Sequence, residues 1–169
     1  MESGLSAGRS LPHVFRYLPS PLGPLLLAGD EQGLRLLHMD AAQPWELAAD
    51  WLPASNQLDD VARQLDEYFA RKRETFEVRV APRGTPFQCE VWQALQRIPY
   101  GTTCSYGELA QAIGNPRSVR AVGTANGANP IAIIIPCHRV IGSNGTLTGF
   151  AGGIERKQIL LELEGTWLI

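Results

Sequence analysis

Three short apolar segments open the patterned part of the chain. Turns rich in proline, glycine and acidic residues separate them, which is typical of neighbouring β-strands. The segments are His13–Leu18, Pro24–Gly29 and Gly33–Met39. A short fourth strand is expected at Glu77–Val80. The first half of the chain therefore predicts a small sheet.

A helical pattern follows Asp59. Val61, Leu65, Tyr68 and Phe69 fall on one face of a helix, and the basic residues 71–73 are expected to close it at the negative end of its dipole. Together the strands and this helix predict a small α/β domain over residues 1–81. Residues 1–10 are expected to be a loose polar tail without the apolar stretch of a secretory signal.

The periodicity becomes helical after a linker at residues 81–86. Thr85 is a good N-cap with Pro86 at the first helical position, and an apolar stripe then runs to a stop at residues 99–101. Two further helices are predicted at Tyr106–Ile113 and Arg117–Asn126. The glycine-containing turn between them is typical of a helix-turn-helix, although such hairpins also occur in protein cores. Residues 82–169 are thus predicted to form a helical domain.

Composition excludes several classes of protein. The 169 residues carry a formal net charge of -2 and 44% hydrophobic residues, which is ordinary for a globular domain. No apolar run approaches the roughly 20 residues of a membrane-spanning helix. The three cysteines and three histidines are scattered, so we expect no disulfide framework, no metal site and a reducing cytoplasmic environment.

The charge distribution changes this picture in the second half. No acidic residue lies between Glu108 and Glu155, whereas Arg117, Arg120 and Arg139 all fall in that stretch. Such a bias fits a surface that faces a polyanion, although chance and partial burial would also produce it.

The third predicted helix consists mostly of small residues. Within its small-residue stretch, Ser118–Gly127, Arg120 is the only long side chain that could project far from the helix. A shallow helix with a single cation fits a nucleic-acid groove lined by phosphates. Tight packing against another helix is the alternative, and the pattern alone leaves both open.

The candidate chemistry follows a continuous apolar run at Ile131–Ile135, predicted to be a buried strand or extended segment. It leads into Cys137, His138 and Arg139. A thiolate is a strong nucleophile, and a neighbouring histidine and arginine can lower the pKa of a thiol. For an isolated Cys-His pair, a buried structural cysteine is the more common interpretation.

The residues flanking Cys137 narrow these alternatives. The run Pro136-Cys137-His138-Arg139-Val140, preceded by Asn129-Pro130 and followed by residues 149–153, resembles the O6-alkylguanine-DNA alkyltransferases. The likeness spans residues 85–165, including residues 106–110 and 120–123, and is weaker at residues 20–25. The stand-alone bacterial type is the closest in pattern.

The resemblance implies a ribonuclease-H-like α/β domain followed by a helix-turn-helix domain that carries the active site. Cys137 would accept an alkyl group from the O6 of guanine, irreversibly and once per molecule. His138 would deprotonate it through a water, Glu164 would orient His138, and Asn129 would brace the turn before the Cys137 segment.

The resemblance also implies the DNA contacts. Because the target atom lies inside the base stack, the nucleotide must be flipped out of the duplex. The small-residue helix would lie in the minor groove of double-stranded DNA, Arg120 would fill the gap and Tyr106 would help to rotate the nucleotide. The expected DNA-binding residues are Arg120, Tyr106, Arg117 and Ala121. The expected substrate pocket comprises Tyr106, Asn126, Val140, Phe150 and Ala151.

Two departures from the family pattern bear on this interpretation. Phe150 stands where many members have tyrosine, and the first half lacks the cysteines with which some members bind zinc. No cofactor is expected, and the protein is predicted to be a monomer that clusters on DNA at most. The alternative is a non-catalytic DNA-binding protein that recognises alkylguanine; Cys137 argues against it. A cysteine hydrolase or a plain transcription regulator leaves the motif unexplained.

Overall fold

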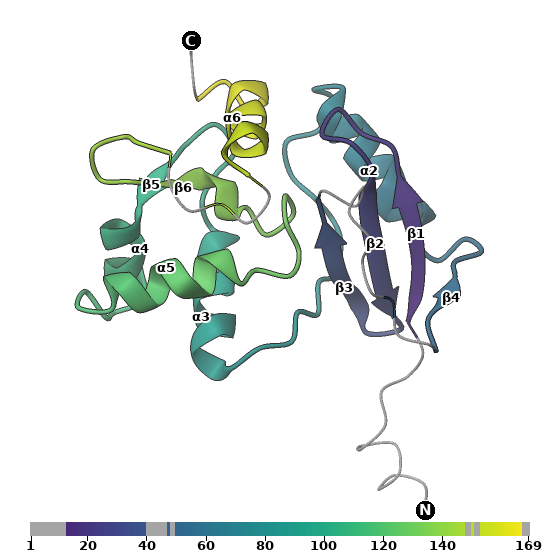
Figure 1. Ribbon diagram of the computed structural model, residues 1–169, viewed down its shortest axis with the longest axis horizontal. Coiled ribbons are helices and arrows are strands. Elements are labelled where there is room, and N and C mark those ends of the chain that lie inside the picture. Colours follow the sequence, from purple (N-terminus) through teal and green to yellow (C-terminus); the bar gives the residue numbers. More distant parts are fainter. Residues whose placement is uncertain (1–12, 40–46, 48–49, 148–149, 151–152, 167–169) are drawn as a thin grey trace, which may run out of the picture.

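The computed structural model describes residues 13–39, 47, 50–147, 150 and 153–166. The first part is a four-stranded sheet with the order β3-β2-β1-β4 (Figure 1). Its strands are β1 (Val14–Leu18), β2 (Leu25–Asp30), β3 (Gly33–His38) and β4 (Leu52–Pro53). The three predicted strands are confirmed. The short β4, which pairs parallel with β1, is not evident from the sequence pattern. The predicted tail at residues 1–10 lies outside the described residues.

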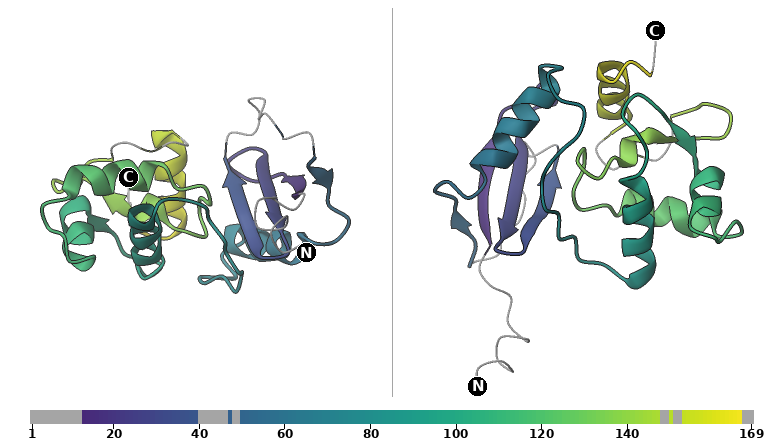
Figure 2. Two further views of the ribbon diagram at one scale, coloured as in Figure 1. Left: turned by 90° about the horizontal axis from the view of Figure 1, so that it is seen from below. Right: turned by 180° about the vertical axis from the view of Figure 1, so that it is seen from behind.

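Helix α2 (Asp59–Phe69) covers one face of this sheet (Figure 2). It buries Val61, Leu65 and Tyr68, as its apolar stripe predicts. The helix ends at Phe69 with Ala70 as its C-cap, and the basic residues 71–73 follow directly and close it as predicted, although none lies in its last turn. Arg71 adopts a positive φ of 61°, which stops the helix there.

The outer edge of β3 is covered by two segments from later in the chain. Val80 forms an isolated bridge with Leu34, and Ile131 forms one with Leu37. The predicted strand at Glu77–Val80 was therefore wrong beyond this single bridge. These contacts protect the sheet edge and fasten the second half of the molecule against the first.

The second part of the molecule is helical. Its first helices are α3 (Pro86–Leu95), α4 (Tyr106–Ala112) and α5 (Val119–Gly127). The side chains of Thr85 and Ser105 form capping boxes at the starts of α3 and α4, which fixes both starts as predicted. Helix α3 stops at Leu95, short of the predicted end, and α5 begins at Val119 rather than Arg117.

The remaining elements assemble around the cysteine. The 3-10 helix η1 (Cys137–Arg139) leads into β6 (Val140–Ile141), which pairs in parallel with β5 (Cys104–Ser105). Helix α6 (Ile154–Leu163) packs against η1. None of these four elements was predicted, because η1 and the two strands have only two or three residues each and α6 has no clear apolar stripe.

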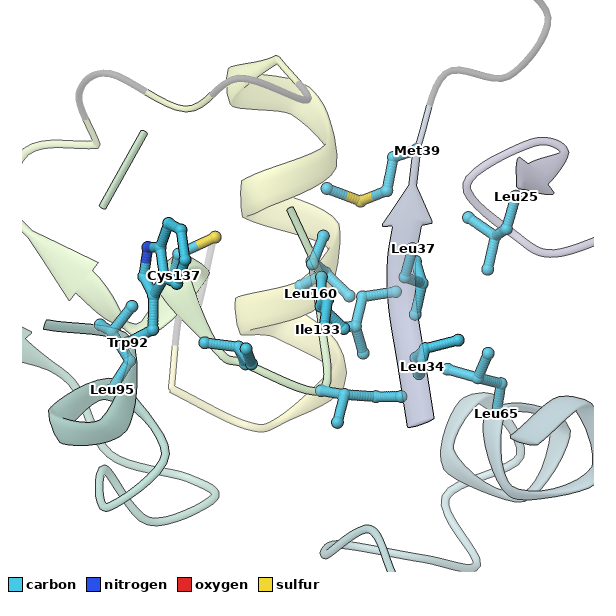
Figure 3. Close-up of a cluster of buried hydrophobic side chains, with 14 of the residues drawn as sticks. Leu25, Leu34, Leu37, Met39, Leu65, Trp92, Leu95, Ile133, Cys137 and Leu160 are labelled. Carbon is cyan, nitrogen blue, oxygen red and sulfur yellow. The ribbon is translucent and has the colours of Figure 1, made fainter. Parts of the chain in front are cut away.

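One hydrophobic core runs through both parts of the molecule. In Figure 3 it extends from Leu65 and Leu34 through Ile133 and Leu160 to Trp92 and Cys137. The cysteine thus lies at one end of a core that the two parts share.

Candidate active site

A tight turn delivers Cys137 to the site. Only Ile131 of the predicted strand at Ile131–Ile135 pairs with another strand; residues 132–134 form a turn in which the buried Ile133 has a positive φ of 72°. The strand prediction was wrong here. A β-branched residue in the left-handed region is strained, so the surrounding packing must hold it there.

Asn129 braces this turn. Its side-chain Nδ2 donates to the carbonyl oxygen of Ile135 at 2.7 Å, and its Oδ1 accepts from the backbone N–H of Ile131 at 3.0 Å. One amide side chain therefore closes the loop that precedes Cys137. The bracing position expected for Asn129 agrees with this geometry.

Cys137 is 6% exposed, and its thiol lies in an apolar setting. Burial raises the pKa of the thiol, whereas a hydrogen bond with Asn129 and the positive charge of Lys157 act in the opposite direction. Asn126 on α5 donates to the Cys137 carbonyl oxygen at 3.4 Å. The resting side chain is thus a neutral thiol with a cation close to it.

His138, Arg139, Glu164 and Tyr68 form a buried group that we call the Glu164 cluster. Glu164 Oε2 accepts hydrogen bonds from Tyr68 Oη at 2.6 Å, from His138 Nε2 at 2.8 Å and from Arg139 Nη2 at 3.1 Å. Glu164 Oε1 accepts from Arg139 Nε at 2.8 Å. Both carboxylate oxygens are therefore satisfied by donors that come from two separate segments of the chain, α2 and η1.

These contacts fix the protonation of His138. Burial on its own raises the pKa of Glu164, but the hydrogen bonds from His138 and Arg139 outweigh it and hold that pKa at about 2. An ionised Glu164 requires the proton on His138 Nε2, which leaves Nδ1 as a free base. Burial lowers the pKa of His138, so the ring is neutral, and no described residue hydrogen-bonds to its Nδ1.

The sequence suggested that Arg139 is the cation beside the thiol. In the structure that cation is Lys157. Arg139 directs its guanidinium to Glu164 and to the carbonyl oxygen of Ile98, 2.6 Å from Nη1. Lys157 on α6 is fully buried, and its Nζ donates to the Val140 carbonyl oxygen at 2.6 Å and lies 5.8 Å from the centre of the Phe150 ring. Burial lowers the pKa of Lys157 to about 8.

Lys157 and Tyr68 are the site residues that sequence reasoning missed. Lys157 stands beside Arg156 in a charged stretch that reads as solvent-exposed, and Tyr68 occupies an apolar stripe that reads as core. The only sequence signal for Lys157 was its position shortly after the Cys137 segment. No sequence signal indicated that the Tyr68 hydroxyl meets Glu164.

The expected DNA-contacting residues lie apart from the Glu164 cluster. Arg117, Arg120 and Ala121 are exposed at the start of α5, beside a groove of about 650 Å³ that α3 and α5 line. Tyr106 packs its ring over Gly123 of α5, where an added Cβ would lie 3.7 Å from the ring. The small residues of α5 thus present a shallow surface with Arg120 beside it.

The expected pocket residues are only partly brought together. Val140 and Phe150 meet at Lys157, and Asn126 contacts the Cys137 backbone. Tyr106 lies on the α4–α5 face, and Ala151 is outside the described residues. Within the described part of the chain, no cluster of three metal-ligating side chains is present and no helix is long and apolar enough to cross a membrane.

Comparisons with known proteins cover both parts of the chain. The family model of the 6-O-methylguanine DNA methyltransferase DNA binding domain matches residues 86–166, and that of the ribonuclease-like domain matches residues 13–82. A methylated-DNA–protein-cysteine methyltransferase of Methanosarcina acetivorans is 53% identical over 148 residues, which are 87% of this chain and 95% of the relative.

Solved structures give the same result. The O6-methylguanine methyltransferase of Mycobacterium tuberculosis has a TM-score of 0.84 at 52% identity, covering 90% of this chain and 92% of that one. A structure of the Mycobacterium tuberculosis protein in complex with DNA has a TM-score of 0.83 at 51% identity, covering 89% and 92%. The predicted fold class, a ribonuclease-like α/β part followed by a helical DNA-binding part, is confirmed.

Proposed function

The chain belongs to the 6-O-methylguanine DNA methyltransferases, which repair DNA by moving an alkyl group to a cysteine of their own, and we propose that Cys137 is that cysteine. The protein is a methyltransferase that is consumed by its own reaction. The observation that carries the assignment is the buried pair of His138 and Glu164, in which His138 follows Cys137 directly in η1 and keeps its Nδ1 as a base that has no partner among the described residues.

His138 and Glu164 convert the neutral thiol of Cys137 into a thiolate during the reaction. His138 Nδ1 takes the thiol proton through a bridging water, and Glu164 stabilises the imidazolium that results. Lys157 stabilises the negative sulfur, because its charge acts directly on Cys137. Burial keeps competing electrophiles away from the reactive form.

The transfer is a direct displacement at carbon. The sulfur of Cys137 forms a bond to the alkyl carbon while the bond between that carbon and guanine O6 breaks. The electron pair of the broken bond goes to O6, and the proton held on His138 balances the charge of the departing guanine. The product is a thioether that no group in the site can cleave, which accounts for a single turnover.

DNA is the partner, and we assign its contact to α5. The exposed Arg117, Arg120 and Ala121, together with the acid-free stretch from residue 109 to residue 154, support a surface that follows the phosphates of the minor groove. Arg120 replaces the flipped O6-alkylguanine in the stack, and Tyr106 presses on the backbone next to it. We assign the base-contacting role to Asn126, Val140, Phe150 and Ala151, as the family resemblance implies.

The two domains divide at residues 81 and 82 in this account. The sheet and α2 precede that point, and the helices that carry Cys137 and Arg120 follow it. A single chain contains all the proposed residues, which supports a monomer that needs no cofactor. The free Cys89, Cys104 and Cys137 suit the reducing cytoplasm.

Mass spectrometry of the intact and digested protein tests the assignment. After incubation with duplex DNA containing O6-methylguanine, we expect one added methyl group per molecule, on the peptide that carries Cys137. A label on Cys89 or Cys104, or more than one methyl group per molecule, contradicts it.

A further inference from the structure

Tyr68 reaches the site from the other half of the molecule. It lies on α2, is completely buried, and packs between aromatic rings whose centres are 5.3 Å (Phe69), 5.4 Å (Phe76) and 6.3 Å (Tyr100) away. These neighbours fix the ring in one place. Its hydroxyl therefore has little freedom to choose another partner.

The hydroxyl donates to Glu164 Oε2 at 2.6 Å, the same oxygen that accepts from His138 Nε2. Tyr68 is therefore a third donor to that oxygen, beside His138 Nε2 and Arg139 Nη2, and it does two things. It holds the carboxylate in the plane that His138 needs, and it satisfies part of the negative charge that would otherwise stabilise an imidazolium. Tyr68 is thus connected to the proton acceptor through a single atom.

Other charged and titratable groups surround this pair. Arg139 neutralises Glu164 from η1, Lys157 acts on His138 from α6, and Tyr100 lies beneath the Arg139 guanidinium at 5.7 Å. Burial, followed by the charge of Glu164, raises the pKa of Tyr68 far above its usual range. The Tyr68 hydroxyl is therefore a neutral donor at every pH at which the protein works.

We propose that Tyr68 is a positioning residue for alkyl transfer, acting through Glu164 to keep His138 neutral with its Nδ1 free to accept the thiol proton. The inference rests on the proposed function, because it requires His138 to be the base for Cys137. It also gives the ribonuclease-like half a direct part in the chemistry performed by the helical half.

The sign of the effect follows from the electrostatics. Without the Tyr68 hydroxyl, Glu164 retains more uncompensated charge and stabilises the imidazolium of His138 more strongly. The pKa of His138 then rises, and a protonated His138 cannot take the proton from Cys137. The reaction therefore stops at a higher pH than in the unmodified protein.

The test is the pH dependence of self-alkylation by free O6-benzylguanine in Tyr68→Phe and in the unmodified protein. We expect the acid limb of the Tyr68→Phe profile to move to higher pH by roughly half a unit to one unit, with a threefold to tenfold slower reaction on that limb. Tyr100→Phe is the matched control, because its hydroxyl donates to the Leu163 carbonyl oxygen at 3.3 Å and not to Glu164. Its acid limb stays in place.

A Tyr68→Phe profile that superimposes on the unmodified one, or that is slower by one factor at every pH, overturns the inference and leaves Tyr68 a packing residue. If Tyr68→Phe does not fold, 3-fluorotyrosine at position 68 keeps the shape and donates more strongly, so the acid limb must move to lower pH; an unmoved limb again overturns the inference. Failure of the unmodified protein to label Cys137 contradicts the proposed function instead.

Discussion

Arg120 on α5 and Arg139 on η1 are placed in opposite surroundings. The Arg120 side chain is exposed, and no described residue hydrogen-bonds to its guanidinium, whereas Arg139 is 6% exposed and gives its donors to Glu164 and the Ile98 carbonyl. The first charge is available to a phosphate or to a gap in a base stack. The second is committed to one carboxylate, where it sets the chemistry of His138.

The comparison extends to the regions around the two arginines. The exposed face of α5, to which we assign the DNA contact, is built of small side chains and lies in solvent, where salt screens its charges. The Glu164 cluster is buried, and hydrogen bonds in such surroundings are stronger than those exposed to solvent. We therefore expect substitutions on the exposed face of α5 to act on DNA recognition alone. Substitutions in the Glu164 cluster or at Lys157 should slow the reaction with every substrate.

The largest expected effect separates chemistry from recognition completely. Cys137→Ser should abolish alkyl transfer, because His138 cannot ionise a hydroxyl at neutral pH. Its affinity for duplex DNA should be unchanged, since the Cys137 side chain is buried and the substitution leaves the exposed residues of α5 in place. Rate measurements with labelled DNA and a fluorescence titration check both halves, and transfer that persists in this variant would remove Cys137 from the account.

Acid unfolding measures how much the charge of Glu164 contributes to the stability of the folded protein. The pKa of Glu164 is about 2 in the folded protein and about 4.5 when exposed, so its stabilising effect is present above pH 4.5 and is lost as the pH falls towards 2. The loss is on the order of 3 kcal/mol in the free energy of unfolding. Burial lowers the pKa of His138 too. Protonation of this histidine therefore adds a further loss of stability as the pH falls below about 6.5, the usual pKa of histidine.

Glu164→Gln should therefore flatten the pH dependence of stability between pH 4.5 and 2, as measured by urea unfolding at several pH values. Glu162→Gln is the control, since among the described residues that carboxylate accepts from Gln158 alone, at 3.3 Å. If the two variants give the same slope, Glu164 is not held ionised by the contacts described above.

Alkylation itself should disturb the packing around Cys137. Adding a methyl group to a well-packed interior costs roughly 1–3 kcal/mol, and the side chain here is 6% exposed within a continuous core. The methylated protein should melt several degrees lower than the free form, and the benzylated protein lower still. Calorimetry of the three forms decides it; identical melting temperatures would mean that the site has spare room.

The smallest effect concerns the cation beside the thiol. Lys157→Met should slow self-alkylation about tenfold, because the pKa of Cys137 rises when the neighbouring charge is lost. Arg156→Met, one position away, is the control. Ultraviolet titration of the thiolate measures the pKa directly, and an unshifted value in Lys157→Met would assign the thiolate's stabilisation elsewhere.

The sequence predicted much of this molecule through two kinds of signal. Periodicity located β1, β2, β3, α2, α3 and α4 because each has a clear apolar face or a capping residue, and the Pro136–Val140 motif indicated Cys137 and His138. The sequence pattern failed at Ile131–Ile135. This apolar run is typical of a strand, but it folds into a turn with Ile133 at a positive φ. Composition carries no information on such a turn.

The two site residues that the sequence did not predict were missed for the same physical reason. Tyr68 and Lys157 act through contacts with partners 96 and 17 positions away, Glu164 and the Val140 carbonyl, and long-range contacts leave no periodic pattern. Arg139 was assigned to the thiol because it is adjacent in sequence. In the folded protein its side chain points instead towards a carboxylate that a later helix brings into place.

The contrast between the two regions is tested most directly by two variants and two substrates. Rate constants for Arg120→Ala and Lys157→Met are measured with duplex DNA containing O6-methylguanine and with the free O6-benzylguanine base. We predict that Arg120→Ala loses about tenfold or more on the duplex and nothing on the free base, which needs no flipping. Lys157→Met should lose the same factor on both. Equal losses of Arg120→Ala on the two substrates would contradict the account.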